Sequence, residues 1–481
     1  MEENSEYIEL DTNLQQLLTA EQAWHYHIVP KKTNDTDIEF YIQAGEDIDT
    51  LTEELEMLFG KTVRLHETPE DKIHKTLGRY YRKGGSKNTK SQSTIDPKNF
   101  EDLLPQLITE ARNLGSSDIH FEIYEEKARV RFRIDGLLVE RYSIEKDEYA
   151  GLINKIKIKS NLDIAEKRLP QDGRIFFDTG ESKFDIRCSV LPTLYGEKVV
   201  LRILGNDAGN IDILEIGMSE YDLANYLEGI KKPNGIILIS GPTGSGKTTT
   251  LYATLKLLNK ETTNIVTIED PVEYTLPGIN QVQLKESIGL GFETALKSFL
   301  RQDPDIIMLG EIREKSTAQM AIRAALTGHL VLSTIHTNSA WATISRLTDM
   351  GIPPLIIAST LNLSVAQRLL RLLCPVCKRL EKFDSTLMPR SYKPPVEVKE
   401  HYVHVGCADC YYTGYFGRTA IYEVVPIDGE VGDLIKTGES DPSKLLKEKG
   451  IKTLSYQAFE VFRFGDTSLE EIYSYLLNTE Y

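Results

Sequence analysis

The sequence predicts an α/β protein in which a nucleotide-binding domain follows two smaller mixed segments. Length is the first observation, since 481 residues correspond to about three domains. Secondly, short apolar runs alternate with helical patterns from about residue 212, which is typical of a parallel sheet covered on both faces. Thirdly, one of these runs leads into the glycine-rich segment 241–248, GPTGSGKT, whose spacing is typical of phosphate-binding loops.

Composition limits the classes of protein to which the chain can belong. Its formal net charge of −16 argues against a general nucleic-acid binder. No apolar stretch approaches the ~18 residues that a membrane-spanning helix requires. The acidic start MEENSEYIEL is unlike a signal peptide, so we expect a cytoplasmic protein. Five cysteines in such a protein favour metal binding over disulfides.

The amino-terminal part of the chain predicts two small domains joined by a linker. Residues 1–82 are acidic, with a strand pattern at 38–42 and an amphipathic helix pattern at 50–58. The polar segment KGGSKNTKSQST at 83–94 predicts a flexible linker. A second domain, of the α+β class, is expected over residues 95–208.

This second domain has a clear hairpin pattern. Helical spacing covers 100–114, and alternating residues over 127–142 surround the turn sequence Asp135-Gly136. Three arginines share one face of the first hairpin strand, and that face is either solvated or a partner-binding surface. These arginines are Arg129, Arg131 and Arg133. Further strands are expected at 174–178, 184–188 and 198–204.

Residues 209–481 predict the nucleotide-binding domain. Buried strands are expected at 236–239, 265–268, 306–309 and 330–335. Helices are expected at 249–258, 294–300 and 317–326. A cysteine-bearing insertion at 371–413 and a helical tail complete this domain.

The phosphate loop predicts a nucleoside triphosphate with Mg²⁺ as the ligand. Its glycines let backbone N–H groups surround phosphate oxygens without a Cβ in the way, and the following helix directs its positive end at the anion. Lys247 would reach the outer phosphates, and the hydroxyl of Thr248 would ligate Mg²⁺. The predicted nucleotide-binding segment comprises Gly241, Pro242, Thr243, Gly244, Ser245, Gly246, Lys247, Thr248 and Thr249.

Acidic residues follow two predicted strands, at the sheet edge where open α/β proteins bind ligands. Glu311 ends the run IIMLGE and would act on the metal through water or on the attacking water. The segment TIEDPVEY offers Glu269, Asp270 and Glu273 as general bases, and the residues alone do not distinguish among them. His336 follows a third strand, where it is either a γ-phosphate sensor or a structural histidine.

Two CxxC pairs, CPVC at 374–377 and CADC at 407–410, predict a metal site. Four thiolates suit tetrahedral zinc, and with no open ligand position the zinc would be structural. The ligands would be Cys374, Cys377, Cys407 and Cys410. The remaining cysteine, Cys188, lies in an alternating strand and is most simply a small buried hydrophobe.

Together these segments resemble the secretion ATPase superfamily, which includes the type II secretion GspE proteins and the PilB ATPases that extend type IV pili. GPTGSGKTTT, TIEDPVEY, LRQDPDIIMLGEIR and TGHLVLSTIHT look like its Walker A, Asp box, Walker B and His box, in the family's order. SSDIHFEIYE, VRFRIDG and QDGRI look like its second N-terminal domain. The resemblance implies a RecA-like ATPase domain with the zinc insertion, a preceding PAS-like domain and a small N-terminal partner-docking domain.

The resemblance also implies roles that the residues alone leave open. The catalytic glutamate of the Asp box corresponds to Glu273 and the Walker B glutamate to Glu311. The His-box pair and the arginines that reach the nucleotide correspond to His329, His336, Arg187, Arg202 and Arg301.

The function implied by the resemblance is that of a hexameric motor in a type II secretion system. It would hydrolyse ATP, with Mg²⁺ and a structural Zn²⁺, to power pseudopilus assembly and protein export. A PilB-type pilus extension or DNA-uptake ATPase is the alternative within the family. The expected partners are an inner-membrane platform protein and a membrane-anchoring protein with a cytoplasmic domain, without specific nucleic acid. Outside the family, the sequence leaves open a DNA translocase or helicase and a nucleotide-gated scaffold without turnover.

Overall fold

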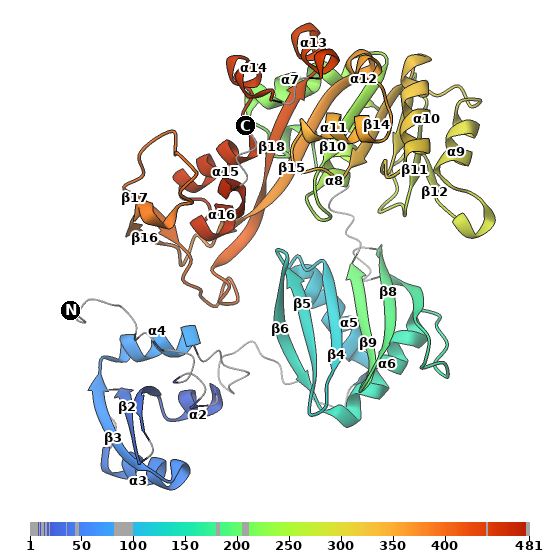
Figure 1. Ribbon diagram of the computed structural model, residues 1–481. Coiled ribbons are helices and arrows are strands. Elements are labelled where there is room, and N and C mark those ends of the chain that lie inside the picture. The colour runs from blue at the N-terminus through green and yellow to red at the C-terminus, as the bar shows by residue number, and fades with distance from the viewer. Residues whose placement is uncertain are drawn as a thin grey trace. The chain divides into compact units, whose positions relative to one another are not determined.

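A computed structural model gives the fold of the chain (Figure 1). It describes residues 20–34, 36–43, 48–80, 100–178, 183–203, 211–438 and 441–477, with positions 8, 10, 14, 17 and 18. The predicted linker at 83–94 lies outside the described residues. The chain forms two compact units, one built mainly from residues before 99 and one mainly from later residues.

The first unit has a three-stranded sheet in the order β1-β2-β3. β1 (Ile28–Thr33) is antiparallel to β2 (Asp37–Gln43), which is parallel to β3 (Thr62–Thr68). Its helices are α2 (Ala20–His25), α3 (Ile48–Phe59) and α4 (Glu70–Tyr80). Alternate residues of β2 are buried in the core, so the predicted strand is confirmed, as is the predicted helix within α3.

The second unit contains a six-stranded sheet in the order β6-β5-β4-β9-β8-β7. Its strands are β4 (Asp118–Ile123), β5 (Ala128–Ile134), β6 (Leu137–Ile144), β7 (Gln171–Asp178), β8 (Lys183–Thr193) and β9 (Gly196–Ile203). Two helices, α5 (Phe100–Asn113) and α6 (Lys146–Lys159), pack against this sheet with their buried side chains. Asp135 and Gly136 both have positive φ, 48° and 85°, as a two-residue hairpin turn requires, so the predicted hairpin is confirmed.

The arginine face of this sheet is paired with carboxylates on β4. Arg129 Nε and Arg131 Nη2 lie 3.0 and 2.7 Å from the oxygens of Glu122, and Arg133 Nε lies 3.6 Å from Asp118. Burial by itself would raise the pKa of Glu122, but hydrogen bonds from Arg131, Lys198 and Arg129 lower it to about 2. The face therefore carries an ion-pair network within the sheet, and its role as a solvated face or a partner-binding surface stays a prediction.

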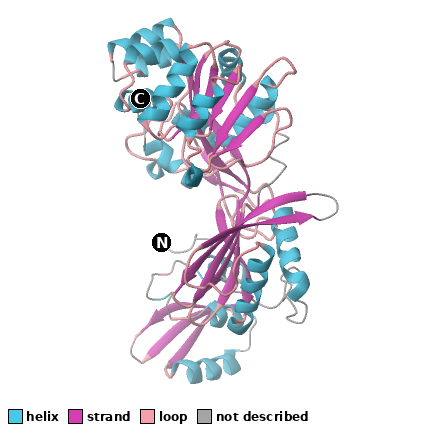
Figure 2. Cartoon of the chain, turned by 90° about the vertical axis from the view of Figure 1, so that its right-hand side faces the viewer, coloured by secondary structure: helices cyan, strands magenta, loops and turns pink. Residues whose placement is uncertain are grey.

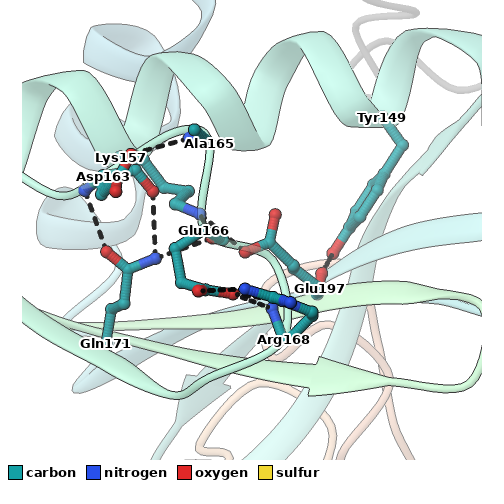
Figure 3. Close-up of polar contacts among 8 residues, drawn as sticks. All are labelled: Tyr149, Lys157, Asp163, Ala165, Glu166, Arg168, Gln171 and Glu197. Atoms are coloured by element: carbon teal, nitrogen blue, oxygen red, sulfur yellow. Dashed lines mark hydrogen bonds and ion pairs between the residues drawn. The ribbon is translucent and has the colours of Figure 1, made fainter.

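A buried lysine holds the loop between α6 and β7 (Figure 3). Lys157 Nζ donates to the Glu166 carbonyl at 2.7 Å and lies 2.8 Å from Glu197 Oε1. Gln171 accepts from the backbone N–H of Asp163 at 2.9 Å and donates to the Asp163 and Glu166 carbonyls, each at 3.0 Å. These bonds determine how the chain enters β7, which pairs along its length with β8.

A seven-stranded sheet in the order β12-β11-β13-β14-β10-β15-β18 forms the rest of the second unit (Figure 1). All neighbouring pairs are parallel except β15 with β18. The strands are β10 (Gly235–Ser240), β11 (Ile265–Glu269), β12 (Asn280–Gln283), β13 (Ile306–Leu309), β14 (Leu330–Ile335), β15 (Leu361–Leu373) and β18 (Tyr415–Pro426). All four predicted strands of this domain are therefore confirmed.

Helices cover both faces of this sheet (Figure 2). Ile237 and Ile239 of β10 pack with α7 (Glu220–Ile230) and α8 (Lys247–Leu258). Ile236 and Leu238 face the opposite core. That core includes α9 (Phe292–Phe299), α10 (Lys315–Leu326), α11 (Ala342–Asp349) and α12 (Pro354–Thr360). The predicted two-sided covering is confirmed.

Two long strands, β15 and β18, are absent from the sequence prediction. A helical tail directly after the insertion is wrong, because β18 comes first and runs antiparallel along β15. Apolar runs such as LLRLL cannot be told from a buried helix by periodicity alone. The insertion holds β16 (Arg379–Lys382) and β17 (Glu400–Val403), and the tail holds α13 (Gly429–Thr437), α14 (Ser443–Glu448), α15 (Leu454–Arg463) and α16 (Leu469–Leu477). Among the helices that the structure describes, none is both long and apolar enough to cross a membrane.

Candidate active site

The phosphate loop lies at the carboxyl end of β10, where the chain turns into α8. Gly241, Gly244 and Gly246 have positive φ angles of 151°, 82° and 87°. A Cβ on Gly241 would lie 2.5 Å from the backbone oxygen of Gln367, so a larger residue does not fit there. The loop thus forms a close turn at a helix N-terminus, the geometry that binds phosphate.

Two buried cations lie beside the loop. Lys247 Nζ donates to two loop carbonyls at 2.8 and 2.9 Å, and burial lowers its pKa despite the opposing charge of Glu311. Arg368 of β15 donates through Nη2 to the carbonyl of Asn338 at 2.7 Å. Arg368 is absent from the sequence prediction, and no motif in the sequence marks it, because β15 also holds Asn362, Gln367 and a second arginine.

An open cavity of about 290 Å³ adjoins the loop. Its lining residues are Gly241, Pro242, His336, Thr337, Asn338 and Arg368. The buried Oγ of Ser245 has no hydrogen-bond partner among the described residues. A glycine cradle, an unpaired buried hydroxyl and two buried cations fit the phosphate groups of a nucleotide.

Glu311 and His336 meet at the carboxyl ends of the neighbouring strands β13 and β14. His336 Nε2 lies 3.3 Å from Glu311 Oε2, and Arg313 pairs with the other carboxylate oxygen. His336 also lines the cavity beside the loop. The structure therefore brings together two residues that the sequence analysis assigned to the site, and their catalytic roles stay predictions.

The three candidate acids of TIEDPVEY have different surroundings. Glu269 is buried, and its carboxylate accepts hydrogen bonds from core side chains that include Tyr252. Asp270 is exposed. The side chain of Glu273 is 39% exposed, and its Oε2 lies 3.3 Å from Arg187 Nη2. Burial sets Glu269 apart from the two more exposed acids, and the role of Glu273 as the base stays a prediction.

Arg187 reaches the Asp box from β8 of the six-stranded sheet. Its Nη2 also donates to the carbonyl of Val272 at 2.8 Å, and its buried Nε has no partner in the described part of the chain. Arg202 lies directly opposite Arg187 on β9, but its Nε donates to Asp118 Oδ1 at 2.9 Å. Arg187 thus contacts the predicted base, whereas Arg202 is paired within its own sheet.

His329 and Arg301 lie away from the phosphate loop of the same chain. The carbonyl of His329 accepts from the N–H of Gly235, the first residue of β10. Arg301 precedes β13, and the carbonyl of the next residue, Gln302, binds the side chain of Asn264 just before β11. Both lie at the amino edge of the sheet, whereas the loop follows the carboxyl edge. Their predicted contact with the nucleotide is not supported within one chain, because a whole strand separates the two edges.

The four predicted zinc ligands converge between β15 and β18. Their sulfur atoms all lie within 4.8 Å of one another. The Sγ atoms of Cys374 and Cys407, Cys377 and Cys410, and Cys407 and Cys410 are 3.9, 3.8 and 3.7 Å apart. A tetrahedron with Zn–S bonds of about 2.3 Å has edges of about 3.8 Å, so the cluster has the dimensions to hold zinc. The N–H of Gly414 donates to Cys410 Sγ at 3.2 Å, as expected around a thiolate ligand.

Comparison with known families agrees with this geometry. The chain matches the family model "Type II/IV secretion system protein" over residues 94–474 and the "MshEN domain" over residues 4–87. It is 47% identical over 377 residues to the "Type IV pilus assembly ATPase PilB" of Myxococcus xanthus. The matched region covers 77% of this chain and 66% of that relative. It is also 47% identical over 339 residues to the "Type II secretion system protein E" of Pseudomonas aeruginosa, covering 70% and 68%. The "Type II secretion system ATPase E" of Vibrio cholerae is 42% identical over 377 residues, covering 77% and 74%.

Solved structures share the fold. The ATPase DotB of Legionella pneumophila matches with a TM-score of 0.59 and 20% identity, over 78% of this chain and 96% of that one. The pilus retraction motor PilT with bound ADP matches with a TM-score of 0.53 and 24% identity, over 77% and 95%. These two likenesses concern the fold alone, which is the predicted RecA-like fold. With the family match over 94–474, they lead to one conclusion: the chain belongs to the Type II/IV secretion system protein family and is a P-loop secretion ATPase.

Proposed function

We propose that the chain is the ATPase motor of a type II secretion system, working as a homo-hexamer to drive pseudopilus assembly and protein export. The observation that carries this proposal is the pairing of His336 with Glu311 beside the phosphate loop, with Glu273 following β11 at the same carboxyl edge of the sheet. Type IV pilus extension is the second candidate, because the PilB of Myxococcus xanthus is as similar to this chain as the type II protein of Pseudomonas aeruginosa.

The chemistry is phosphoryl transfer to water. Lys247 and the loop N–H groups would bind the phosphates of ATP, and Thr248 would hold Mg²⁺, which would supply positive charge to the phosphate oxygens. Glu273 orients the attacking water and accepts its proton. The Glu311–His336 pair would face the γ-phosphate from the cavity beside the loop and respond to its loss.

Arg187 links this chemistry to movement. Its guanidinium comes from the six-stranded sheet and contacts Glu273, which follows β11 of the seven-stranded sheet. Any change in charge at the base therefore acts directly on the preceding domain, and Arg202 on the neighbouring strand would join Arg187 at the phosphates once that domain closes. Such a closure is a rigid-body motion of the kind that performs mechanical work.

The partners follow from this role. The motor would act at the cytoplasmic membrane on a platform protein, with residues 1–82 docking on a membrane-anchoring partner. The four-cysteine cluster would hold structural Zn²⁺, joining the start of the insertion to its end. The acidic balance of the chain supports a protein partner over DNA.

Replacement of Lys247 by Ala tests the proposal. We expect Mg²⁺-dependent ATP hydrolysis to fall below about 1% of the wild-type rate, since this cation neutralises phosphate charge in the ground state and the transition state. Lys256→Ala, on an exposed turn of the same helix, is the matched control and should retain wild-type turnover. Phosphate release by the purified, assembled chain is the measurement. Full activity of Lys247→Ala, or stimulation of the wild-type chain by DNA, would contradict the proposal.

A further inference from the structure

A buried polar cluster lies under the Asp-box turn and has no part in the chemistry proposed above. Glu269 ends β11, Tyr252 lies on α8, and Gln281 lies on β12. Glu269 is 3% exposed and Tyr252 is fully buried. Burying a carboxylate and a phenol is costly unless both are hydrogen-bonded, so the partners of these two groups show what the cluster holds in place.

Within the cluster, Glu269 accepts three side-chain hydrogen bonds. The hydroxyl of Tyr252 donates to Oε2. Thr267 Oγ1 and Gln281 Nε2 donate to Oε1, at 2.5 and 3.1 Å. Burial raises the pKa of Glu269, although its three hydrogen bonds lower it in part. Burial also raises the pKa of Tyr252, so the tyrosine hydroxyl keeps its proton.

The same cluster holds the backbone of the turn that carries Glu273. The N–H of Glu273 points to Tyr252 Oη at 3.4 Å. Gln281 Nε2 donates to the carbonyl of Tyr274 at 3.1 Å, and Gln281 Oε1 accepts from the N–H of Leu276 at 2.6 Å. The rings of Tyr252 and Tyr274 pack edge to face, with centroids 4.6 Å apart.

We propose that Tyr252 and Glu269 are positioning residues that set the distance between Glu273 and the phosphate loop. The link is direct, because α8, which carries Tyr252, begins at Lys247. The inference rests on the proposed function of Glu273 as the group that orients the attacking water. The carboxylate of Glu273 is half-exposed and contacts Arg187. The hydrogen bond from the backbone N–H of Glu273 to Tyr252 therefore limits where this carboxylate can lie. A misplacement of about 1 Å at a reacting group costs on the order of 100-fold in rate.

Tyr252→Phe tests this role, since it removes one hydroxyl and keeps the ring that packs on Tyr274. We expect kcat for ATP hydrolysis to fall about 10-fold while KM for ATP stays at the wild-type value, because a displaced base affects the transition state alone. Tyr226→Phe is the matched control. This variant removes the hydroxyl of another fully buried tyrosine. That hydroxyl is hydrogen-bonded to Thr254 of α8 instead of to the Asp-box turn, so kcat should stay unchanged.

A double-mutant cycle shows whether the effect passes through Glu273. In a Glu273→Gln background, Tyr252→Phe should cause no further loss of kcat. An equal loss in both backgrounds, or a lowered melting temperature with unchanged kcat, would overturn the positioning role. The two proposals fail in different ways. A wild-type kcat in Tyr252→Phe beside an inactive Glu273→Gln overturns this inference alone, whereas full turnover in Glu273→Gln overturns the base and this inference with it.

Discussion

Replacement of Glu273 by Gln is expected to lower kcat for ATP hydrolysis at least about 100-fold, the scale on which general-base catalysis contributes. The amide keeps the shape of the side chain but cannot accept the proton of the attacking water. ATP affinity should change less than about twofold, because the phosphates are bound by Lys247 and the loop N–H groups. Steady-state phosphate release and equilibrium binding of a fluorescent ATP analogue measure the two quantities separately.

The control for this variant is Glu293→Gln, an exposed acid on α9 whose partner is Lys297 one turn away. It should retain wild-type turnover. Full turnover in Glu273→Gln would move the base to Asp270, since Glu269 is buried and bonded to core side chains. Because Arg187 pairs with Glu273, the variant also leaves that guanidinium facing a neutral group. A double mutant with Arg187→Gln would measure the coupling between the two.

Replacement of Cys374 by Ser is expected to release zinc and unfold the insertion. Structural zinc contributes about 10–16 kcal/mol in small domains, far more than the few strands of the insertion can supply by packing. Bound zinc should fall from about one atom per chain to near zero by atomic emission. Limited proteolysis should then cut between residues 374 and 414, where wild-type protein resists.

Cys188→Ser provides the control for the metal measurement. Cys188 is buried in β8, away from the four-cysteine cluster, so the zinc content of this variant should equal that of the wild type. Unchanged zinc in Cys374→Ser would contradict the proposed zinc site. ATP binding in Cys374→Ser should persist, because the phosphate loop packs against Gln367 in the middle of β15, several residues before Cys374.

Local sequence patterns predicted those elements whose stability is decided locally. The Asp135-Gly136 hairpin was predictable because two consecutive residues with positive φ suit this pair. The apolar runs of β10, β11, β13 and β14 were predictable because strands buried on both faces need continuous apolar sequence. β15 and β18 were not, since β15 mixes helical and strand spacing and its partner lies about 50 residues away.

Motifs by themselves predicted the ligand class and the family and limited the base to three acids, because phosphate loops and thiolate pairs are short and depend on residue type alone. Tertiary structure decided which of those residues meet. Glu269 is buried whereas Glu273 is partly exposed, and Arg187 contacts Glu273 whereas Arg202 pairs with Asp118. His336 lines the cavity beside the phosphate loop, whereas His329 lies at the opposite sheet edge. Arg368 and Tyr252 join the site only through strand and helix packing. The physical reason is that contact between side chains depends on strand direction and order, which no local stretch of sequence encodes.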